Sequence, residues 1–249
     1  MTQFFAARPT VLALAFAAGL AAVPAVAQTT LAPQGAAAQT APQTGVAIPV
    51  AGPSAAIPAT GGVQPVKLNP AQREVLGTIN KYFNSIRMMY GDFVQFGPDG
   101  ERSEGQFFME RPGKIRFIYA KPSTLDIVSD GTDVVVRDRK NQTQDLYPLS
   151  KTPLRFLLSD QIDLTTEANV TRVGIEPDLV SIVLEQSTVF GDGHLTLIFD
   201  RKSSELKQWT VTDAQNYDTS VAIYNVKQNQ PIDPITFKYD RLAPALQRK

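Results

Sequence analysis

Few side chains in this sequence are of the types that usually perform catalysis or hold metals. The chain has one histidine, His194, and no cysteine. His194 follows Gly191-Asp192-Gly193 at the start of a strand-like run, where a surface histidine beside a turn is more common than a catalytic base. Because zinc sites are built mainly from histidine and cysteine, we expect no metal site and no cofactor.

Two groups of carboxylates lie close together in the sequence. Asp160 and Asp163 are three residues apart in LSDQIDL, and Asp99, Glu101 and Glu104 surround a turn. Paired carboxylates perform glycoside hydrolysis, so a secreted hydrolase is one alternative. Charged residues in turns are mostly exposed to solvent, and we therefore predict that the protein is not an enzyme.

Arg111 is the polar residue whose position is most informative. It ends a strand-like run in EGQFFMERPGKIRFIY, residues 104–119, directly before Pro112 and Gly113, which favour a type II turn. Its guanidinium can donate hydrogen bonds to several carbonyl oxygens at once. Two interpretations stay open: a solvent-facing charge at a turn, or a latch that holds a helical lid over a cavity.

The hairpin that carries this turn has one apolar face. Side chains alternate along a strand, so Phe107 and Met109 share a face of the first strand, and Ile115, Phe117 and Tyr119 share a face of the second. The charged residues between them fall on the opposite face. Whether protein or ligand covers the apolar face decides what the protein does.

An amphipathic helix precedes this hairpin. In NPAQREVLGTINKYFNSIR, residues 69–87, Asn69 is a candidate N-cap and Pro70 takes the first helical position. The opposite face, which includes Asn80, is expected to face water. The apolar stripe consists of Val75, Leu76, Ile79, Phe83 and Ile86.

Short strand-like runs make up most of the remaining sequence, and a short helical piece is expected at 153–158. The alternation and the spacing of turn residues predict a mainly β protein with helices (α+β), built on a large curved antiparallel sheet whose concave face the helices cover. Besides the hairpin, the runs are 88–96, 125–131, 133–139, 143–149, 168–176, 179–187, 194–201, 205–213 and 219–227.

The N-terminal part of the chain differs from the rest in composition. Arg8, an apolar run and then Ala25-Val26-Ala27 predict a secretory signal peptide over residues 1–27, cleaved after Ala27. Residues 28–66 carry no charge and are rich in Ala, Pro and Gln, which predicts a disordered linker.

Residues 67–249 are then left as one domain. Lys and Arg together number 24 and Asp and Glu together number 24, which argues against a nucleic-acid-binding protein. An exported chain without cysteine has neither disulfides nor a site for its own lipid anchor. We therefore expect an exported protein that carries no lipid anchor of its own.

Several motifs, in this order, resemble the LolA family of periplasmic outer-membrane lipoprotein carriers. The resemblance implies an incomplete antiparallel β-barrel covered by a helical lid, with Arg111 as the residue that holds the lid closed. Phe117 takes the place of an aromatic residue that is often Trp in the family. The motifs are GDFVQF, EGQFFMERPGKIRFIY, IVSDG, GHLTLIFDRKSSELKQWTVTDAQN and PITFKYD.

The same resemblance implies a function and partners. The protein would bind the acyl chains of lipoproteins released by an inner-membrane ATP-driven complex and deliver them to an outer-membrane acceptor. We expect a monomer. The main alternative is a periplasmic sensor of lipid or lipoprotein with the same fold, which would relay a signal through a partner.

An apolar lining is what such a cargo requires. About 40 methylenes at about 0.8 kcal/mol each amount to roughly 30 kcal/mol of transfer free energy, which a few hydrogen bonds do not offset. Leu206 competes with Trp209 and Val211 for the interior, and each candidate could equally be ordinary core. The predicted lining residues are Phe93, Phe107, Met109, Ile115, Phe117, Ile182, Leu184, Leu197, Phe199, Trp209 and Val211.

Overall fold

The computed structural model describes residues 67–239, except residue 168 and residues 189–190. The predicted signal peptide, residues 1–27, and the predicted linker, residues 28–66, lie outside the described residues. Within the described part of the chain, no helix has the length and apolar character needed to cross a membrane.

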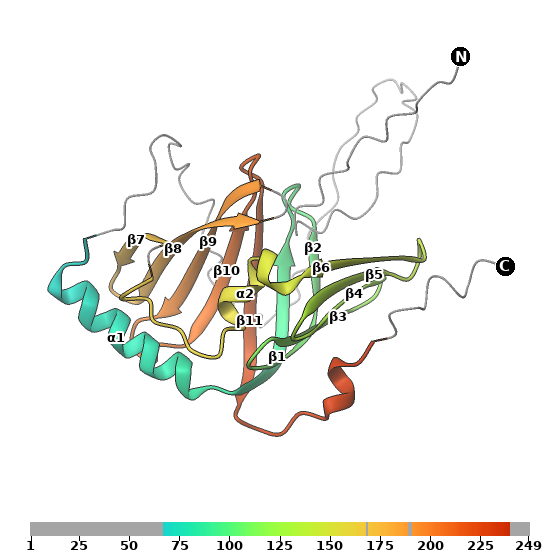
Figure 1. The fold of residues 1–249 in the computed structure, drawn as a ribbon, viewed down its shortest axis with the longest axis horizontal. Helices are drawn as coiled ribbons and strands as arrows, with labels where there is room; N and C mark the ends of the chain where they lie inside the picture. The colour runs from blue at the N-terminus through green and yellow to red at the C-terminus, as the bar shows by residue number, and fades with distance from the viewer. Residues whose placement is uncertain (1–66, 168, 189–190, 240–249) are drawn as a thin grey trace, which may run out of the picture. The chain divides into compact units, whose positions relative to one another are not determined.

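Eleven strands form one antiparallel sheet with the order β6-β5-β4-β3-β2-β1-β11-β10-β9-β8-β7 (Figure 1). The first and last strands of the sequence pair at its centre, and β6 and β7 are its two edges. The strands are β1 (Met88–Phe96), β2 (Arg102–Glu110), β3 (Lys114–Tyr119), β4 (Leu125–Asp130), β5 (Asp133–Asp138), β6 (Thr143–Pro148), β7 (Val170–Ile175), β8 (Leu179–Thr188), β9 (Gly191–Asp200), β10 (Leu206–Thr212) and β11 (Asp218–Gln228).

The predicted fold class is confirmed. Each predicted strand-like run overlaps one strand, with ends that agree to within three residues, and the sheet stays open at β6 and β7, as in an incomplete barrel. Helices cover its concave face, where one apolar cluster includes residues from both helices and from most strands. The sheet thus supplies a wall and the helices supply a lid.

Helix α1 (Pro70–Ser85) forms where the sequence predicts it. Its N-terminus has a capping box, in which the Gln72 backbone N–H donates to Asn69 Oδ1 and the Asn69 backbone N–H donates to Gln72 Oε1, both at 2.9 Å. Phe83 on its apolar face packs edge-on against Phe199 of β9, with ring centroids 6.1 Å apart. The helix therefore crosses the half of the sheet formed by β7–β10 (Figure 1).

Helix α2 (Leu154–Leu157) follows the short 3₁₀ helix η1 (Leu149–Lys151). Two of its leucines, Leu154 and Leu157, are buried, together with the next residue, Leu158. The predicted helical piece at 153–158 is thus present, one residue shorter at each end. It packs on the concave side and adds a second element to the lid (Figure 1).

A β-bulge in β10 decides which residues of that strand face the interior. Leu206 pairs with Phe199, whereas Gln208 already pairs with Ile198, so the register shifts between them. The extra residue brings Leu206 and Trp209 to the same face, where they are 6% and 5% exposed. The expected competition between the two side chains does not occur, because both face inward.

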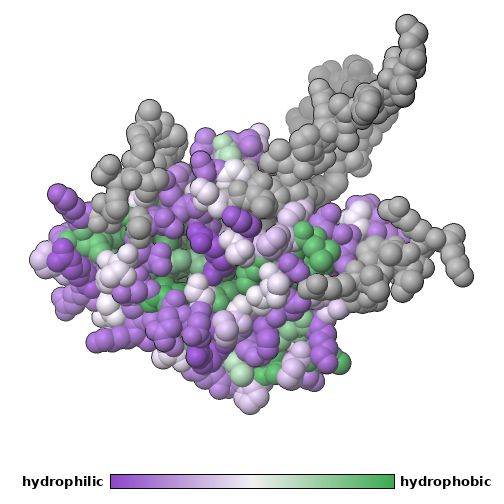
Figure 2. Space-filling view, viewed as in Figure 1, coloured by the Kyte–Doolittle hydropathy of each residue, from purple (hydrophilic) through white to green (hydrophobic). Residues whose placement is uncertain are grey.

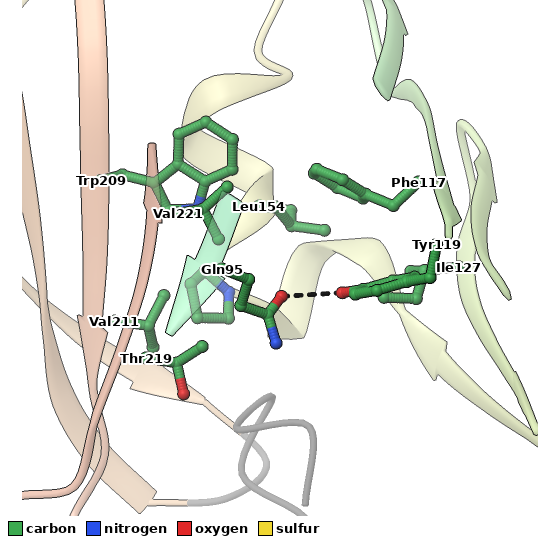
Figure 3. Close-up of a pocket in the computed structure, with 10 residues that line it drawn as sticks. Gln95, Phe117, Tyr119, Ile127, Leu154, Trp209, Val211, Thr219 and Val221 are labelled. Carbon is green, nitrogen blue, oxygen red and sulfur yellow. Dashed lines mark hydrogen bonds between the residues drawn. The ribbon is translucent and has the colours of Figure 1, made fainter. Parts of the chain in front are cut away.

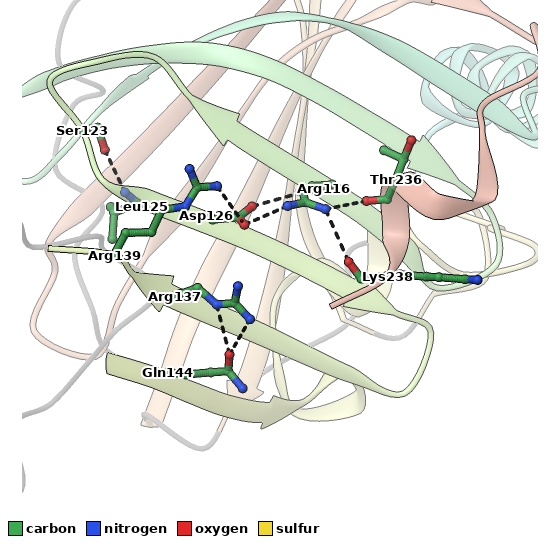
Figure 4. Close-up of polar contacts among 9 residues, drawn as sticks. All are labelled: Arg116, Ser123, Leu125, Asp126, Arg137, Arg139, Gln144, Thr236 and Lys238. Carbon is green, nitrogen blue, oxygen red and sulfur yellow. Dashed lines mark hydrogen bonds and ion pairs between the residues drawn. The ribbon is translucent and has the colours of Figure 1, made fainter. Parts of the chain in front are cut away.

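The convex face of the sheet carries a strap made by η2 (Pro234–Phe237). Arg116 of β3 reaches it by donating to the carbonyl oxygens of Thr236 at 2.9 Å and Lys238 at 3.4 Å (Figure 4). Phe237 of the strap lies under the Lys114 ammonium, 5.8 Å from the ring centroid. These contacts attach the C-terminal part of the described chain to β3.

The carboxylate of Asp126, in β4, holds the side chain of Arg116 in this position. Asp126 is 3% exposed, and it receives two hydrogen bonds from Arg116, at 2.8 Å and 3.1 Å, and one from Arg139 at 3.3 Å (Figure 4). A buried carboxylate that is paired in this way contributes to stability mainly because its loss leaves the partner unpaired.

We predict that Asp126→Ala lowers the free energy of unfolding by about 2–3 kcal/mol, because the half-buried Arg116 loses its partner. Urea unfolding followed by circular dichroism measures the change. The matched control is Asp178→Ala, since Asp178 pairs with Lys202 at 3.2 Å where both side chains are exposed. We expect less than about 0.5 kcal/mol for this control, and equal losses in both variants would contradict the argument.

Candidate ligand-binding cavity

The predicted lining residues converge on one apolar interior. Ten of the eleven are at most 5% exposed, and Val211 is half-buried against the same cluster. Phe93 lies at the centre of an aromatic group, with its ring edge-on to Phe117 at 5.2 Å and to Tyr119 at 5.0 Å. Trp209 approaches Phe117 from β10, with ring centroids 6.2 Å apart. Whether these residues bind a ligand stays a prediction.

A small cavity of about 30 Å³ opens in this interior beneath α2 (Figure 3). Of the predicted residues, Phe117, Trp209 and Val211 line it, and the other eight pack as core around it. A cavity needs about 10–15 Å³ to hold one water, so this one has room for about two and none for an acyl chain. The residues that the sequence reasoning missed are Gln95, Tyr119, Ile127, Pro153, Leu154, Thr219 and Val221.

Strand alternation contains a signal for most of the missed residues. Gln95 shares a face of β1 with Phe93, and Thr219 shares a face of β11 with Val221 and Ile223.

Hydrophilic side chains predominate on the face seen in Figure 2, with hydrophobic ones in separate small areas between them. The apolar residues of the described chain are thus mostly enclosed, as a closed lid requires.

Arg111 fastens the lid to the sheet. Its side chain is buried, with 4% of the residue exposed, which excludes the solvent-facing alternative. Nε and Nη2 donate to the Ile86 carbonyl at 3.0 Å and 2.7 Å, Nη2 also donates to the Phe83 carbonyl, and Nη1 donates to the Ser159 carbonyl at 3.4 Å. The guanidinium also lies 4.8 Å from the Phe83 ring centroid. One side chain thereby contacts α1 and the segment after α2.

These bonds cap the C-terminus of α1. The last carbonyls of a helix have no partner within it and carry partial negative charge. The last turn of α1 has no basic residue of its own, so Arg111 supplies the positive charge from the turn between β2 and β3. Burial lowers the pKa of Arg111, and nearby Arg87 acts in the same direction, yet an arginine stays charged throughout the physiological range.

The turn itself is suited to this contact. Gly113 has the predicted positive φ, +82°, whereas the cis peptide bond between Arg111 and Pro112 was not predicted. The Gly113 N–H donates to the Leu158 carbonyl at 2.9 Å. A Cβ at Gly113 would lie 2.6 Å from Gly131 Cα, so no larger residue fits without a shift of the backbone. The turn therefore contacts both the lid and the neighbouring β4–β5 turn.

Two asparagines join α1 to the segment that follows α2. Asn84 Nδ2 donates to the Ile162 carbonyl at 2.8 Å, and the Ile162 N–H donates back to Asn84 Oδ1 at 2.9 Å. Asn80, one helical turn earlier, accepts from the Leu164 N–H at 3.0 Å and donates to Asp163 at 2.8 Å. The prediction that Asn80 faces only water is thus wrong, because the helix and this segment form one lid.

The candidate catalytic carboxylates serve structural contacts instead. Asp160 pairs with Arg87 at 2.5 Å at the end of α1, and both side chains are more than half exposed. Hydrogen bonds from Thr165 lower the pKa of Asp163, and Asn80 adds to this effect. Asp160 and Asp163 therefore each make contacts that join the lid segment to α1 and to Arg87, which follows it.

The remaining candidates for chemistry are also dispersed. Asp99 accepts from the Glu101 N–H at 3.0 Å within its turn, and Glu104 pairs with Arg102 at 2.6 Å. His194 lies in β9, half-buried, and not in the turn expected for it. In the described part of the chain, no group of three or more His, Cys, Asp or Glu residues is placed to hold a metal ion.

The fold and the site together define a protein that encloses an apolar interior under a helical lid fastened by one arginine. A family model described as "Outer membrane lipoprotein carrier protein LolA" matches residues 84–240, more than half of the chain. The chain belongs to this family.

Curated relatives named "Outer-membrane lipoprotein carrier protein" are distant in sequence. The relative from Methylococcus capsulatus is 25% identical over 170 residues, which cover 65% of this chain and 81% of the relative. The relative from Halorhodospira halophila is 25% identical over 189 residues, which cover 70% of this chain and 85% of the relative.

Solved structures are matched at low similarity. The "LolA superfamily protein NE2245 from Nitrosomonas europaea" has a TM-score of 0.36 and 11% identity, with 66% of this chain and 97% of that chain covered. The Pseudomonas aeruginosa MucA/MucB complex has a TM-score of 0.41 and 10% identity, with 68% of this chain and 60% of that chain covered.

We predict that Asn84→Ala loosens the segment 159–167 from α1, because both hydrogen bonds to Ile162 are lost. Hydrogen–deuterium exchange should show the Ile162 amide exchanging about tenfold faster or more, as the loss of two hydrogen bonds implies. Lys81→Ala, at an exposed position of the same helix, is the control and should leave this exchange unchanged. Unchanged protection of the Ile162 amide in Asn84→Ala would show that the asparagine does not hold the segment.

Proposed function

We propose that this chain is a periplasmic carrier that binds the acyl chains of lipoproteins released from the inner membrane and delivers them to the outer membrane. The observation that carries the proposal is the Arg111 contact, which fixes a helical lid over an apolar interior through backbone carbonyls. Such a closure can open without unfolding the sheet. Membership of the lipoprotein-carrier family supports the same function.

The free energy gained by burying a cargo can be compared with the free energy lost when the lid opens. The cavity beneath α2 has no room for an acyl chain, so loading it must lift the helices of the lid and break the bonds of Arg111. Each of those four bonds has a charged donor and contributes about 1.5–3 kcal/mol, so together they contribute about 6–12 kcal/mol. Burial of one chain with about 15 methylenes gains roughly 12 kcal/mol, and burial of the about 40 methylenes of a triacylated cargo gains roughly 30 kcal/mol, which exceeds that loss. An apolar cargo is thus able to open the lid, whereas a polar one is not.

Closure of the lid then favours release. When cargo leaves, Arg111 regains its carbonyl partners and Phe83 packs again on Phe199. The empty closed state is therefore lower in free energy than an empty open one. This difference makes transfer to an acceptor downhill.

The proposed carrier has defined domain boundaries and a partner at each membrane. The carrier domain would comprise residues 67–249, after a signal peptide at 1–27 and a linker at 28–66. It would act as a monomer, receive cargo from an inner-membrane ATP-driven complex and pass it to an outer-membrane acceptor.

Release of acylated lipoprotein from spheroplasts tests the function. The purified protein should bring lipoprotein into the soluble fraction in a complex with itself. A sensor of the same fold would instead bind a signalling protein and leave lipoprotein in the membrane. Failure to solubilise any lipoprotein would refute the carrier function.

We predict that Arg111→Leu accepts lipoprotein but transfers it roughly tenfold more slowly or worse, because the closed state loses charge-assisted hydrogen bonds. Arg111→Lys should also be impaired, since one ammonium does not reach several carbonyls in a fixed fork. Transfer from the purified complex to outer-membrane vesicles measures the rate.

The control for this prediction is Arg155→Leu, which removes the same charge from an exposed position on α2. Its transfer rate should match that of the unmodified protein. If Arg111→Leu delivered cargo at the normal rate, Arg111 would not act as the latch.

A further inference from the structure

One end of the cavity is polar. Gln95 of β1, Tyr119 of β3 and Thr219 of β11 line it together, whereas Phe117 and Trp209 line its apolar part (Figure 3). Gln95 and Thr219 are 4% and 3% exposed, so both are buried polar side chains. Their presence in an otherwise apolar interior needs a physical reason.

Among the residues that the structure describes, none forms a hydrogen bond with the Thr219 hydroxyl. Its Oγ1 is fully buried and unpaired. On the opposite face of β11, the Ser220 hydroxyl forms a hydrogen bond of 2.8 Å with the hydroxyl of Thr210 in β10. Buried polar atoms are nearly always hydrogen-bonded, so the unpaired Oγ1 at the cavity points to a partner that binds there.

Gln95 is held in one orientation beside it. The Tyr119 hydroxyl donates to Gln95 Oε1 at 2.7 Å, which turns the amide NH₂ of Gln95 away from the tyrosine (Figure 3). Burial raises the pKa of Tyr119, so the phenol stays protonated and keeps donating. The NH₂ group and the Thr219 hydroxyl are thus both able to donate to a ligand.

The site favours a neutral acceptor. No Lys, Arg, Asp or Glu is among the described residues that line the cavity. An ionised carboxylate would lose its hydration there without a cation to pair with, which is strongly unfavourable. A carbonyl oxygen needs only hydrogen-bond donors, and it gains them without that loss.

The position of these groups fits a ligand with a polar head and an apolar tail. Gln95 is the last residue but one of β1, and Thr219 is the second residue of β11, so the polar end lies near the ends of both strands. Phe117 and Trp209 lie further along the strands. A ligand whose polar head lies at this end would place its hydrocarbon chain toward Phe117 and Trp209.

We propose that Gln95 and Thr219 form a subsite for the neutral carbonyl group of an acyl ester or acyl amide, whose hydrocarbon chain lies between Phe117 and Trp209. This inference rests on the proposed carrier function and adds a preference that the apolar lining alone does not provide. The subsite would bind acyl groups that are linked to a cargo more tightly than free fatty acids.

The chain contains a single tryptophan, and Trp209 lines the cavity, so its fluorescence reports binding directly. The probes are the methyl ester of 9,10-dibromostearic acid, the free acid at pH 8 and a dibromoalkane of matched length, each delivered from cyclodextrin to the purified chain. Bromine quenches the tryptophan on contact. We expect the ester to bind about fivefold or more tightly than the alkane, as one additional hydrogen bond implies, and the ionised acid to bind most weakly.

Thr219→Val is the decisive variant because it preserves shape and suits a strand. It should bind the alkane as before and lose the preference for the ester, whereas Thr219→Ser should retain the preference. Gln186→Met is the control, since it removes another unpaired buried polar atom at a position that does not line the cavity. This control should leave all three affinities unchanged.

The outcomes are distinct. An ester preference that Thr219→Val abolishes supports the subsite. Equal binding of ester and alkane, or a preference that survives in Thr219→Val, overturns the subsite and leaves the carrier function standing. Absence of quenching by any of the three probes overturns the carrier function and the subsite with it.

Discussion

The bond between one guanidinium and the carbonyls at the end of a helix is the interaction on which this structure depends. Helix α1 ends without a glycine cap and without a basic residue in its last turn, so its final carbonyls need donors from elsewhere. Arg111 provides them from a turn of the sheet and joins the segment after α2 to the same point. When the lid lifts, water can solvate both the carbonyls and the guanidinium. The contact is therefore strong when enclosed and separable without leaving unpaired groups.

The sequence predicted the elements better than the contacts between them. Asn69 and the apolar stripe marked α1, and strict alternation marked the strands, because both signals are local. Arg111 could be placed at a turn, but its acceptors lie 25 to 48 residues away, and no local pattern identifies them. The bulge in β10 and the asparagine contacts of α1 depend in the same way on pairing between distant segments. Side chains that act only through long-range pairs were thus left undecided or missed.

A closed interior changes how the apolar residues should be understood. Most of the residues expected to line a binding site are close-packed core in this structure, and under the proposed function the same atoms would form the binding surface once the lid opens. Phe117 stands where the family resemblance leads one to expect a tryptophan, and Trp209 comes within 6.2 Å of it from the opposite half of the sheet. The bulge that turns Trp209 inward therefore restores a large aromatic surface at this wall.

The pairing of β1 with β11 has a consequence for how the chain acquires its structure. These strands are the first and the last in the sequence, and they join the two halves of the sheet. Such a distant pairing forms slowly, because closing the long loop between the strands costs conformational entropy before the strands can form stabilising contacts. During synthesis the two half-sheets remain separate until the C-terminal strand emerges. Under the proposed export, the chain gains from this delay, because it stays able to thread through a membrane until translocation is almost complete.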